Sequence, residues 1–130
     1  MEGLVLKADW EPKKDYKITD FEKKTKKAIT ASSVWRNPEL SLEELQKPKI
    51  GSDEVLLKVK SCGICGTDVH LYETDKEGYV LYPGLARFPS VLGHEFSGII
   101  EEPGKEVKAL KAGDMVTVEE MNWCGEFTPC

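Results

Sequence analysis

Two short segments hold the residue types that bind a transition metal. The first runs Cys62-Gly63-Ile64-Cys65-Gly66-Thr67-Asp68-Val69-His70, and the second runs Gly93-His94-Glu95-Phe96-Ser97-Gly98. Together they contain both histidines of the chain and two of its four cysteines. Thiolate, imidazole and carboxylate groups are ligands that suit zinc, so the two segments predict a metal site.

The same residues also have simpler interpretations. A Cys-x-x-Cys pair on its own can be a redox pair or half of a structural zinc site. Cys62 is expected to be a small buried residue at the end of a strand. Thr67 can cap a helix, and His70 can be a solvated residue of that helix.

The elements that position these segments are predicted to be mainly strands. Alternating or β-branched apolar residues predict strands over residues 3–8, 54–60, 96–101, 107–110 and 115–119. Residues 33–45 are expected to extend along a sheet edge, because Pro38 and Pro48 argue against a central strand. A short helix is predicted over 67–72, and glycines and prolines mark 77–89 as a loop. Short strands separated by turns are typical of a small barrel or sandwich.

Length and charge narrow the class of protein. A chain of 130 residues is long enough for one globular domain, and its formal net charge of -5 argues against nucleic acid as a partner. The first ten residues lack the apolar region of a signal peptide, and no segment approaches the length that crosses a membrane. A cytoplasmic protein with reduced thiols is therefore expected.

The residues around His94 resemble those of zinc-containing medium-chain alcohol and polyol dehydrogenases. Gly93-His94-Glu95 is followed at that family's spacing by Gly98, Gly104, Val107, Gly113-Asp114 and Val116. The similar region runs from about Val55 to the carboxyl end, and Met1 to Asp9 looks like the family's first strand. The resemblance implies a mainly β, GroES-like barrel with one or two short helices over residues 1–130. It also implies a small-molecule alcohol or polyol as substrate, zinc as cofactor in an incomplete catalytic site, and NAD(P) only if a Rossmann domain is supplied elsewhere.

The resemblance also implies roles for individual residues. Cys65 and His94 would bind one catalytic zinc. Glu95 would lie beside the metal and is the third residue predicted for the metal site. Asp68 would accept a hydrogen bond from the far ring nitrogen of His94. Thr67 would pass the proton of the alcohol from its hydroxyl towards His70.

The sequence departs from that family in several respects. Of the four cysteines that hold a structural zinc in some members, only Cys124 and Cys130 remain, so no structural zinc is expected. The third catalytic ligand of relatives would fall beyond Cys130, and the Gly-x-Gly-x-x-Gly fingerprint of a Rossmann domain is absent. The chain alone is therefore expected to be inactive. The long stretch from Cys65 to His94 looks most similar to the branch that oxidises cyclitols such as scyllo-inosose, and it could border the substrate cleft.

Two other functions remain open at this point. In the first, a non-enzymatic module binds zinc through four thiolates, those of Cys62, Cys65, Cys124 and Cys130. In the second, a barrel remnant without metal associates through its exposed edges. Under the dehydrogenase interpretation, a face that packs on the cofactor domain in relatives would meet water. Either a homo-oligomer or a separate cofactor-binding partner is then expected to cover that face.

Overall fold

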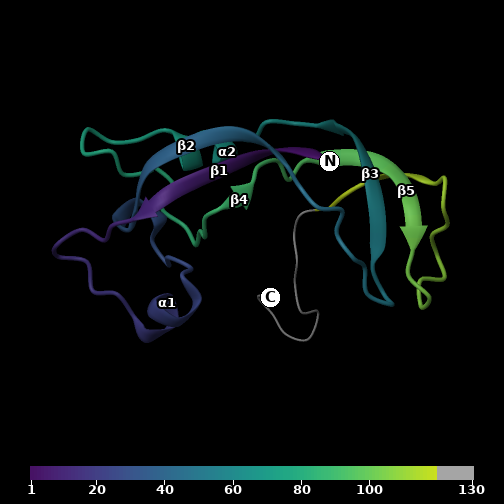
Figure 1. Ribbon diagram of the computed structural model, residues 1–130, viewed down its shortest axis with the longest axis horizontal. Coiled ribbons are helices and arrows are strands. Elements are labelled where there is room, and N and C mark those ends of the chain that lie inside the picture. Colours follow the sequence, from purple (N-terminus) through teal and green to yellow (C-terminus); the bar gives the residue numbers. More distant parts are fainter. Residues whose placement is uncertain (120–130) are drawn as a thin grey trace. The chain divides into compact units, whose positions relative to one another are not determined.

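The computed structural model describes residues 1–119, which form two compact units (Figure 1). The first unit comprises residues 1–46 and 65–92, and the second comprises 47–64 and the described residues from 93 onward. Both units are built mainly from antiparallel strands, as predicted. No helix in the described part of the chain has the length and apolar character needed to cross a membrane.

The sheet of the first unit contains three antiparallel strands in the order β2-β1-β4. These are β1 (Glu2–Trp10), β2 (Trp35–Glu44) and β4 (Ser90–Val91). β2 is an edge strand, as the prolines predicted, and its register against β1 shifts where Asn37 and Pro38 lie opposite Ala8. Proline lacks the N–H that a strand ladder uses, so a bulge on an edge strand accommodates Pro38.

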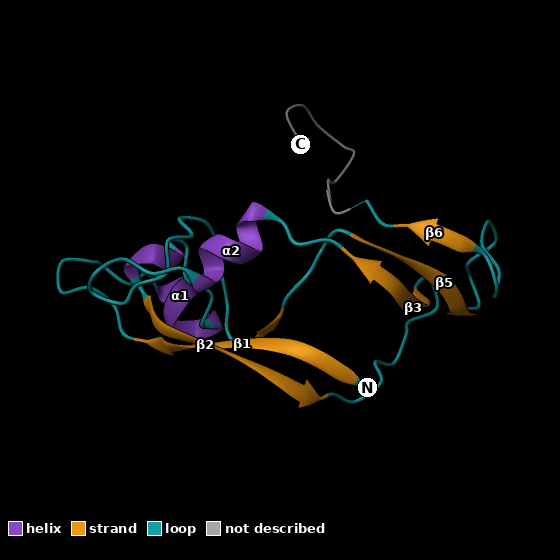
Figure 2. Cartoon of the chain, turned by 90° about the horizontal axis from the view of Figure 1, so that it is seen from above, coloured by secondary structure: helices purple, strands orange, loops and turns teal. Residues whose placement is uncertain are grey.

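Helices α1 (Asp20–Thr25) and α2 (Gly66–Tyr72) lie on the same side of this sheet (Figure 2). The sequence predicted α2 but not α1. A single-turn 3-10 helix, η1 (Ala31–Ser33), leads into β2. The buried core beneath the helices includes Leu6, Val34, Val80 and two aromatic rings. The rings of Trp35 and Phe88 meet edge to face with centroids 5.1 Å apart, a favoured geometry for aromatic pairs.

Helix α1 is fixed by a carboxylate that is itself fully buried. The carboxylate of Glu22 accepts hydrogen bonds from the Tyr16 hydroxyl, from both the N–H and the hydroxyl of Thr19, and from the N–H of Ile29, at 2.8 to 2.9 Å. Burial raises the pKa of Glu22, but these hydrogen bonds outweigh burial and lower the pKa to about 2. Glu22 is therefore a charged part of the core.

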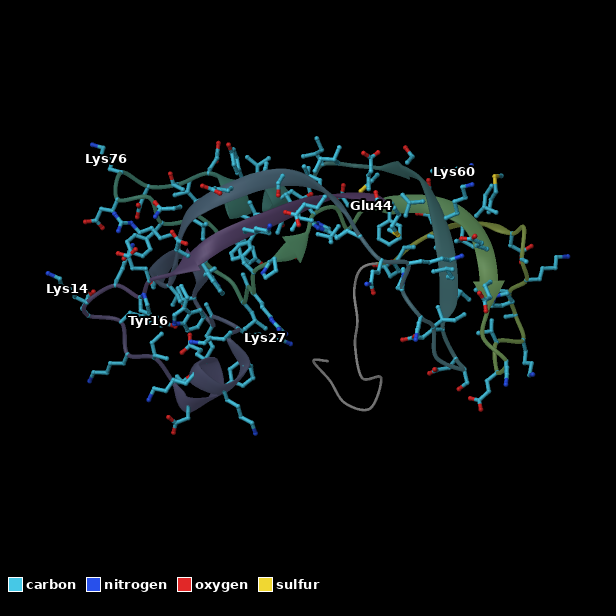
Figure 3. All side chains as sticks on the ribbon, in the orientation of Figure 1. Lys14, Tyr16, Lys27, Glu44, Lys60 and Lys76 are labelled. Atoms are coloured by element: carbon cyan, nitrogen blue, oxygen red, sulfur yellow. The ribbon has the colours of Figure 1, made fainter. Side chains whose placement is uncertain are left out.

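Residues 77–89 contain no helix or strand, as the glycines and prolines predicted, and the loop begins earlier, at Glu73. Asp75 organises the first turn of this loop, because its Oδ1 accepts the N–H groups of Glu77 and Tyr79 at 2.9 and 3.0 Å. Partial burial raises the pKa of Asp75, but these bonds and the ammonium of Lys13 lower it overall. The side chain of Lys76 points into solvent at the turn (Figure 3).

The second unit contains β3 (Val55–Cys62), β5 (Phe96–Pro103) and β6 (Met115–Thr117), in the order β3-β5-β6. The prediction of a strand at residues 107–110 is wrong. Those residues follow a turn in which the N–H of Val107 bonds the carbonyl of Gly104 at 3.1 Å, so the segment turns back instead of extending. Gly98 lies where β3 approaches β5 closely, since a Cβ there would lie 2.5 Å from the Lys58 carbonyl oxygen.

Candidate metal centre

The ladder between β3 and β5 brings together the two segments that the sequence singled out. Its last pair joins Cys62 with Phe96, and one further hydrogen bond runs from the N–H of Gly63 to the carbonyl of Glu95 at 2.7 Å. In an antiparallel pair, residues that follow on one strand lie opposite residues that precede on the other. Cys65 therefore leaves the end of the ladder beside the point where His94 enters it.

Gly93 shapes the entry to the ladder. Its φ of +95° lies in the left-handed region, which side chains rarely adopt. A Cβ at this position would also lie 2.5 Å from Sγ of Cys62. Both constraints require glycine directly before His94. The glycine of the Gly-His pair is therefore explained by the backbone structure, and the histidine by metal chemistry.

His94 and Glu95 present ligand atoms that lie within 4.8 Å of each other. The imidazole of His94 is half-buried and the carboxylate of Glu95 is exposed. Cys65, which follows the last residue of β3 by three positions in the chain, supplies the third predicted donor, a thiol. One thiol, one imidazole and one carboxylate match the donor set of a catalytic zinc site, which has three protein ligands and one open position. The donor chemistry therefore fits zinc.

Helix α2 begins directly after Cys65 and fixes its backbone. The N–H of Cys65 donates to Oδ2 of Asp68 at 3.0 Å, and the carboxylate of Asp68 is buried. The thiol of Cys65 donates to Oγ1 of Thr67 at 3.7 Å. Asp68 and Thr67 thus hold Cys65 in place from within the first unit.

Thr67, Asp68 and His70 lie on one short helix, as predicted, but their surroundings differ. Thr67 is half-buried beside the Cys65 thiol, whereas His70 is exposed and its Nδ1 lies 3.6 Å from Oε2 of Glu73. The predicted roles of Thr67 and His70 in proton transfer, and of Asp68 towards His94, remain predictions. The exposed position of His70 would suit exchange of protons with solvent.

Cys62 does not fulfil the expectation of a buried residue. Its side chain is exposed at the end of β3, and its thiol donates to the carbonyl of Gly63 at 3.4 Å. The strand turns its last residues outward, so sequence position alone did not indicate burial. Cys124 and Cys130 lie outside the described residues. The four-thiolate site needs both of them, so it stays a prediction.

The sequence interpretation missed two residues of this unit. Glu22 could have been found, because Thr19 and Glu22 have the spacing of a helix-capping box. Arg87 carries no local sequence signal, because the residues that line the hollow beside it come from two separate segments of the chain, helix α2 and residues 82–90. Arg87 lines a hollow beside Thr67.

Comparisons with known proteins agree with this architecture. The family profile of the alcohol dehydrogenase GroES-like domain matches residues 51–130. Scyllo-inosose 3-dehydrogenase of Thermotoga maritima is 45% identical over 137 aligned residues, which cover 100% of this chain and 35% of that protein. L-threonine 3-dehydrogenase of Bacillus subtilis is 45% identical over 89 residues, which cover 68% of this chain and 24% of that protein.

A solved structure from Thermotoga maritima, described as an alcohol dehydrogenase, superposes with a TM-score of 0.91 at 45% identity. The superposition covers 99% of this chain and 34% of the solved one. This similarity confirms the predicted GroES-like fold. The chain spans about a third or less of the length of these relatives. Because the family profile matches more than half of the chain, the protein belongs to the alcohol dehydrogenase GroES-like domain family.

Proposed function

We propose that this chain is the zinc-binding catalytic part of an NAD(P)-linked alcohol or polyol dehydrogenase. The observation that supports the proposal is the end of the β3–β5 ladder, where His94 and Glu95 have ligand atoms within 4.8 Å of each other and where Cys65 follows β3 by three residues in the chain. The relatives named above are dehydrogenases of a cyclic polyol ketone and of a hydroxy amino acid, which supports a substrate with a secondary alcohol. A cytoplasmic location and self-association also remain proposals.

Cys65, His94 and Glu95 would hold the zinc. Zinc bound there would supply Lewis acidity that stabilises negative charge on the alcohol oxygen as hydride leaves for NAD(P). The buried carboxylate of Asp68 would orient the site by holding the backbone of Cys65.

The chain's own hydroxyl and imidazole would then handle the proton. Oγ1 of Thr67, which contacts the Cys65 thiol, would accept the proton of the alcohol and release its own hydrogen towards solvent. His70 lies one helical turn further along α2 and is exposed, so its imidazole could take that proton to the surface.

A zinc titration of three variants tests the proposal. His94→Ala and Cys65→Ser each remove one ligand, and each is expected to weaken zinc binding by more than about 100-fold, beyond the loss typical of residues that only orient ligands. His70→Ala serves as the matched control, because it removes the other imidazole of the chain from an exposed position. Affinity measured by competition with a chromogenic chelator gives the readout.

The result also separates the alternative functions. Zinc affinity that survives His94→Ala but is lost in Cys62→Ser would replace the proposal with the four-thiolate module. A wild-type chain that binds no zinc at micromolar concentration would leave only the metal-free alternative.

A further inference from the structure

The first unit carries a hollow beside Thr67 that the zinc chemistry does not use. Its volume is about 180 Å³, and its apolar wall is formed by Leu71, Leu85, Ala86 and Phe88. Four polar side chains complete the lining, those of Thr67, Tyr82, Arg87 and Ser90. We propose that Arg87 determines specificity here by donating hydrogen bonds to the hydroxyls of a cyclic polyol. As a statement about a substrate, the inference rests on the proposed function.

The loop that carries Arg87 is fixed before any ligand arrives. Ala86 exchanges two backbone hydrogen bonds with Ala28, at 2.8 and 3.0 Å, and its carbonyl also accepts Nε1–H of Trp35 at 3.1 Å. On the other side of Arg87, Phe88 is buried in the core against Trp35. The backbone at Arg87 is thus held from both neighbours, so ligand binding would not have to order the loop itself.

The second side of the hollow is fixed to helix α2. The N–H of Tyr82 donates to the carbonyl of His70 at 2.9 Å, and the carbonyl of Tyr82 accepts the N–H of Ser32 at 2.9 Å. The ring of Tyr82 lies close over Gly84, where a Cβ would meet the hydroxyl oxygen at 2.8 Å. The bond to His70 therefore fixes Tyr82 to the same helix that carries Thr67.

Arg87 has unused hydrogen-bonding capacity. Within residues 1–119 it makes no hydrogen bond or ion pair, whereas Arg36 bonds both the Glu11 carboxylate at 2.7 Å and the Glu77 carbonyl at 2.6 Å. A guanidinium stays charged at every physiological pH and presents five N–H donors in a planar fork. A ligand with adjacent oxygen acceptors would fit that fork.

The remaining lining distinguishes a polyol from a carboxylate. A carboxylate only accepts hydrogen bonds, so the guanidinium alone would satisfy it. The hydroxyls of Thr67, Tyr82 and Ser90 both donate and accept, as the hydroxyls of a polyol do. The C–H face of a six-membered ring would pack on the apolar wall. One ring hydroxyl would then reach Thr67, next to the proposed zinc ligand, while others reach Arg87.

The test uses the 130-residue chain and three probes: myo-inositol, cyclohexanol and lactate. Binding is followed by changes in backbone and guanidinium NMR resonances, with and without zinc. Myo-inositol is expected to shift the signals of Thr67, Tyr82 and Arg87 and to bind more tightly than either other probe. Arg87→Gln is expected to weaken its binding by about 10-fold or more, since hydrogen bonds to a charged group are lost.

Two further variants sharpen the result. Arg87→Lys keeps the charge but removes the fork, so it is expected to weaken binding as well, though by less than Arg87→Gln. Lys76→Gln removes an exposed charge elsewhere in the same loop and is expected to leave binding unchanged (Figure 3).

Binding of myo-inositol that is unaffected by Arg87→Gln, or that shifts signals elsewhere, would overturn the assignment. Tighter binding of lactate would overturn the polyol in favour of a carboxylate ligand. All lining residues belong to the first unit, so the titration does not require zinc. Loss of zinc binding with intact polyol binding would refute the proposed function, and the opposite pattern would refute this inference.

Discussion

The two units of this chain are stabilised in different ways. In the first unit, nine apolar residues are buried, and they include Leu6, Val34 and Val80 with no exposure at all. In the described part of the second unit, only Leu56 and Ile100 are buried apolar residues. Burial of apolar surface is the main favourable term in folding, so the first unit has the larger internal source of stability.

The difference in buried apolar core matches the function proposed for each unit. The first unit carries a preformed hollow, which requires a rigid scaffold. The second unit carries His94 and Glu95 at the end of a three-stranded sheet whose register depends on close approaches at Gly93 and Gly98. A metal bound at that end would supply stability that the small core lacks. Four changes test this comparison.

The largest effect is expected from Ile100→Ala. Ile100 is 1% exposed, and truncating a buried isoleucine costs about 2–5 kcal/mol. Because the second unit has only one other buried apolar residue among those described, the loss should unfold β3, β5 and β6 selectively. Hydrogen exchange read by mass spectrometry should speed up in residues 55–62 and 96–103 but not in β1.

Ile99→Ala, on the opposite face of the same strand, is the control and should change exchange little. Equal acceleration in β1 would show that the units unfold together.

Zinc removal is expected to have the next largest effect. A ligand that binds only the folded state stabilises it by about 2.7 kcal/mol at a concentration of 100 times its dissociation constant. Chelation should therefore lower the urea midpoint of the second unit by more than that of the first. The zinc-dependent shift should vanish in His94→Ala. A shift of equal size in that variant would assign the metal to other ligands.

Gly98→Ala tests the register of the second sheet directly. The added Cβ would lie 2.5 Å from the Lys58 carbonyl oxygen and 3.0 Å from Cγ of Leu57, so β3 and β5 must move apart. Overpacking of this kind costs about 1–3 kcal/mol. Gly66→Ala is the matched control, because a Cβ there meets nothing within 4 Å. Thermal unfolding of both variants measures the difference, and similar melting temperatures would contradict the close approach.

Much of this organisation could be predicted from local pattern. Alternation of apolar residues identified β1 and β3, and the prolines placed β2 at an edge. The short helix α2 was predicted to begin at Thr67, one residue after its observed start at Gly66. These features depend on residues near one another in the sequence.

The features that could not be predicted depend on distant contacts. Helix α1 lies in a lysine-rich segment with few apolar residues, and its anchor is the carboxylate of Glu22, which reaches partners as far along the chain as Ile29. The turn at residues 107–110 is decided by a hydrogen bond to Gly104, although the residues themselves favour a strand. Arg87 became notable only when the fold set it between two anchored neighbours, Ala86 and Phe88. Tertiary context overrode local preference in each case.

The smallest effect is expected from Glu22→Gln, which tests the charge buried in the first unit. Each carboxylate oxygen of Glu22 accepts one backbone N–H, from Thr19 or from Ile29. An amide offers one oxygen only, so one N–H must face an NH₂ group, at a cost of about 1–2 kcal/mol at neutral pH.

The pH dependence of the same variant has a definite sign. The pKa of Glu22 is lowered from 4.5 to about 2 by folding, so its contribution to stability is complete above pH 4.5 and is lost as the pH falls towards 2. The wild-type chain should lose stability over that window, and Glu22→Gln should show a shallower loss, because the amide does not titrate. Urea unfolding at several pH values, followed by tryptophan fluorescence, measures both slopes. Parallel slopes would mean that folding does not lower the pKa of Glu22 and would contradict the stabilisation of its charge by the hydrogen bonds in the first unit.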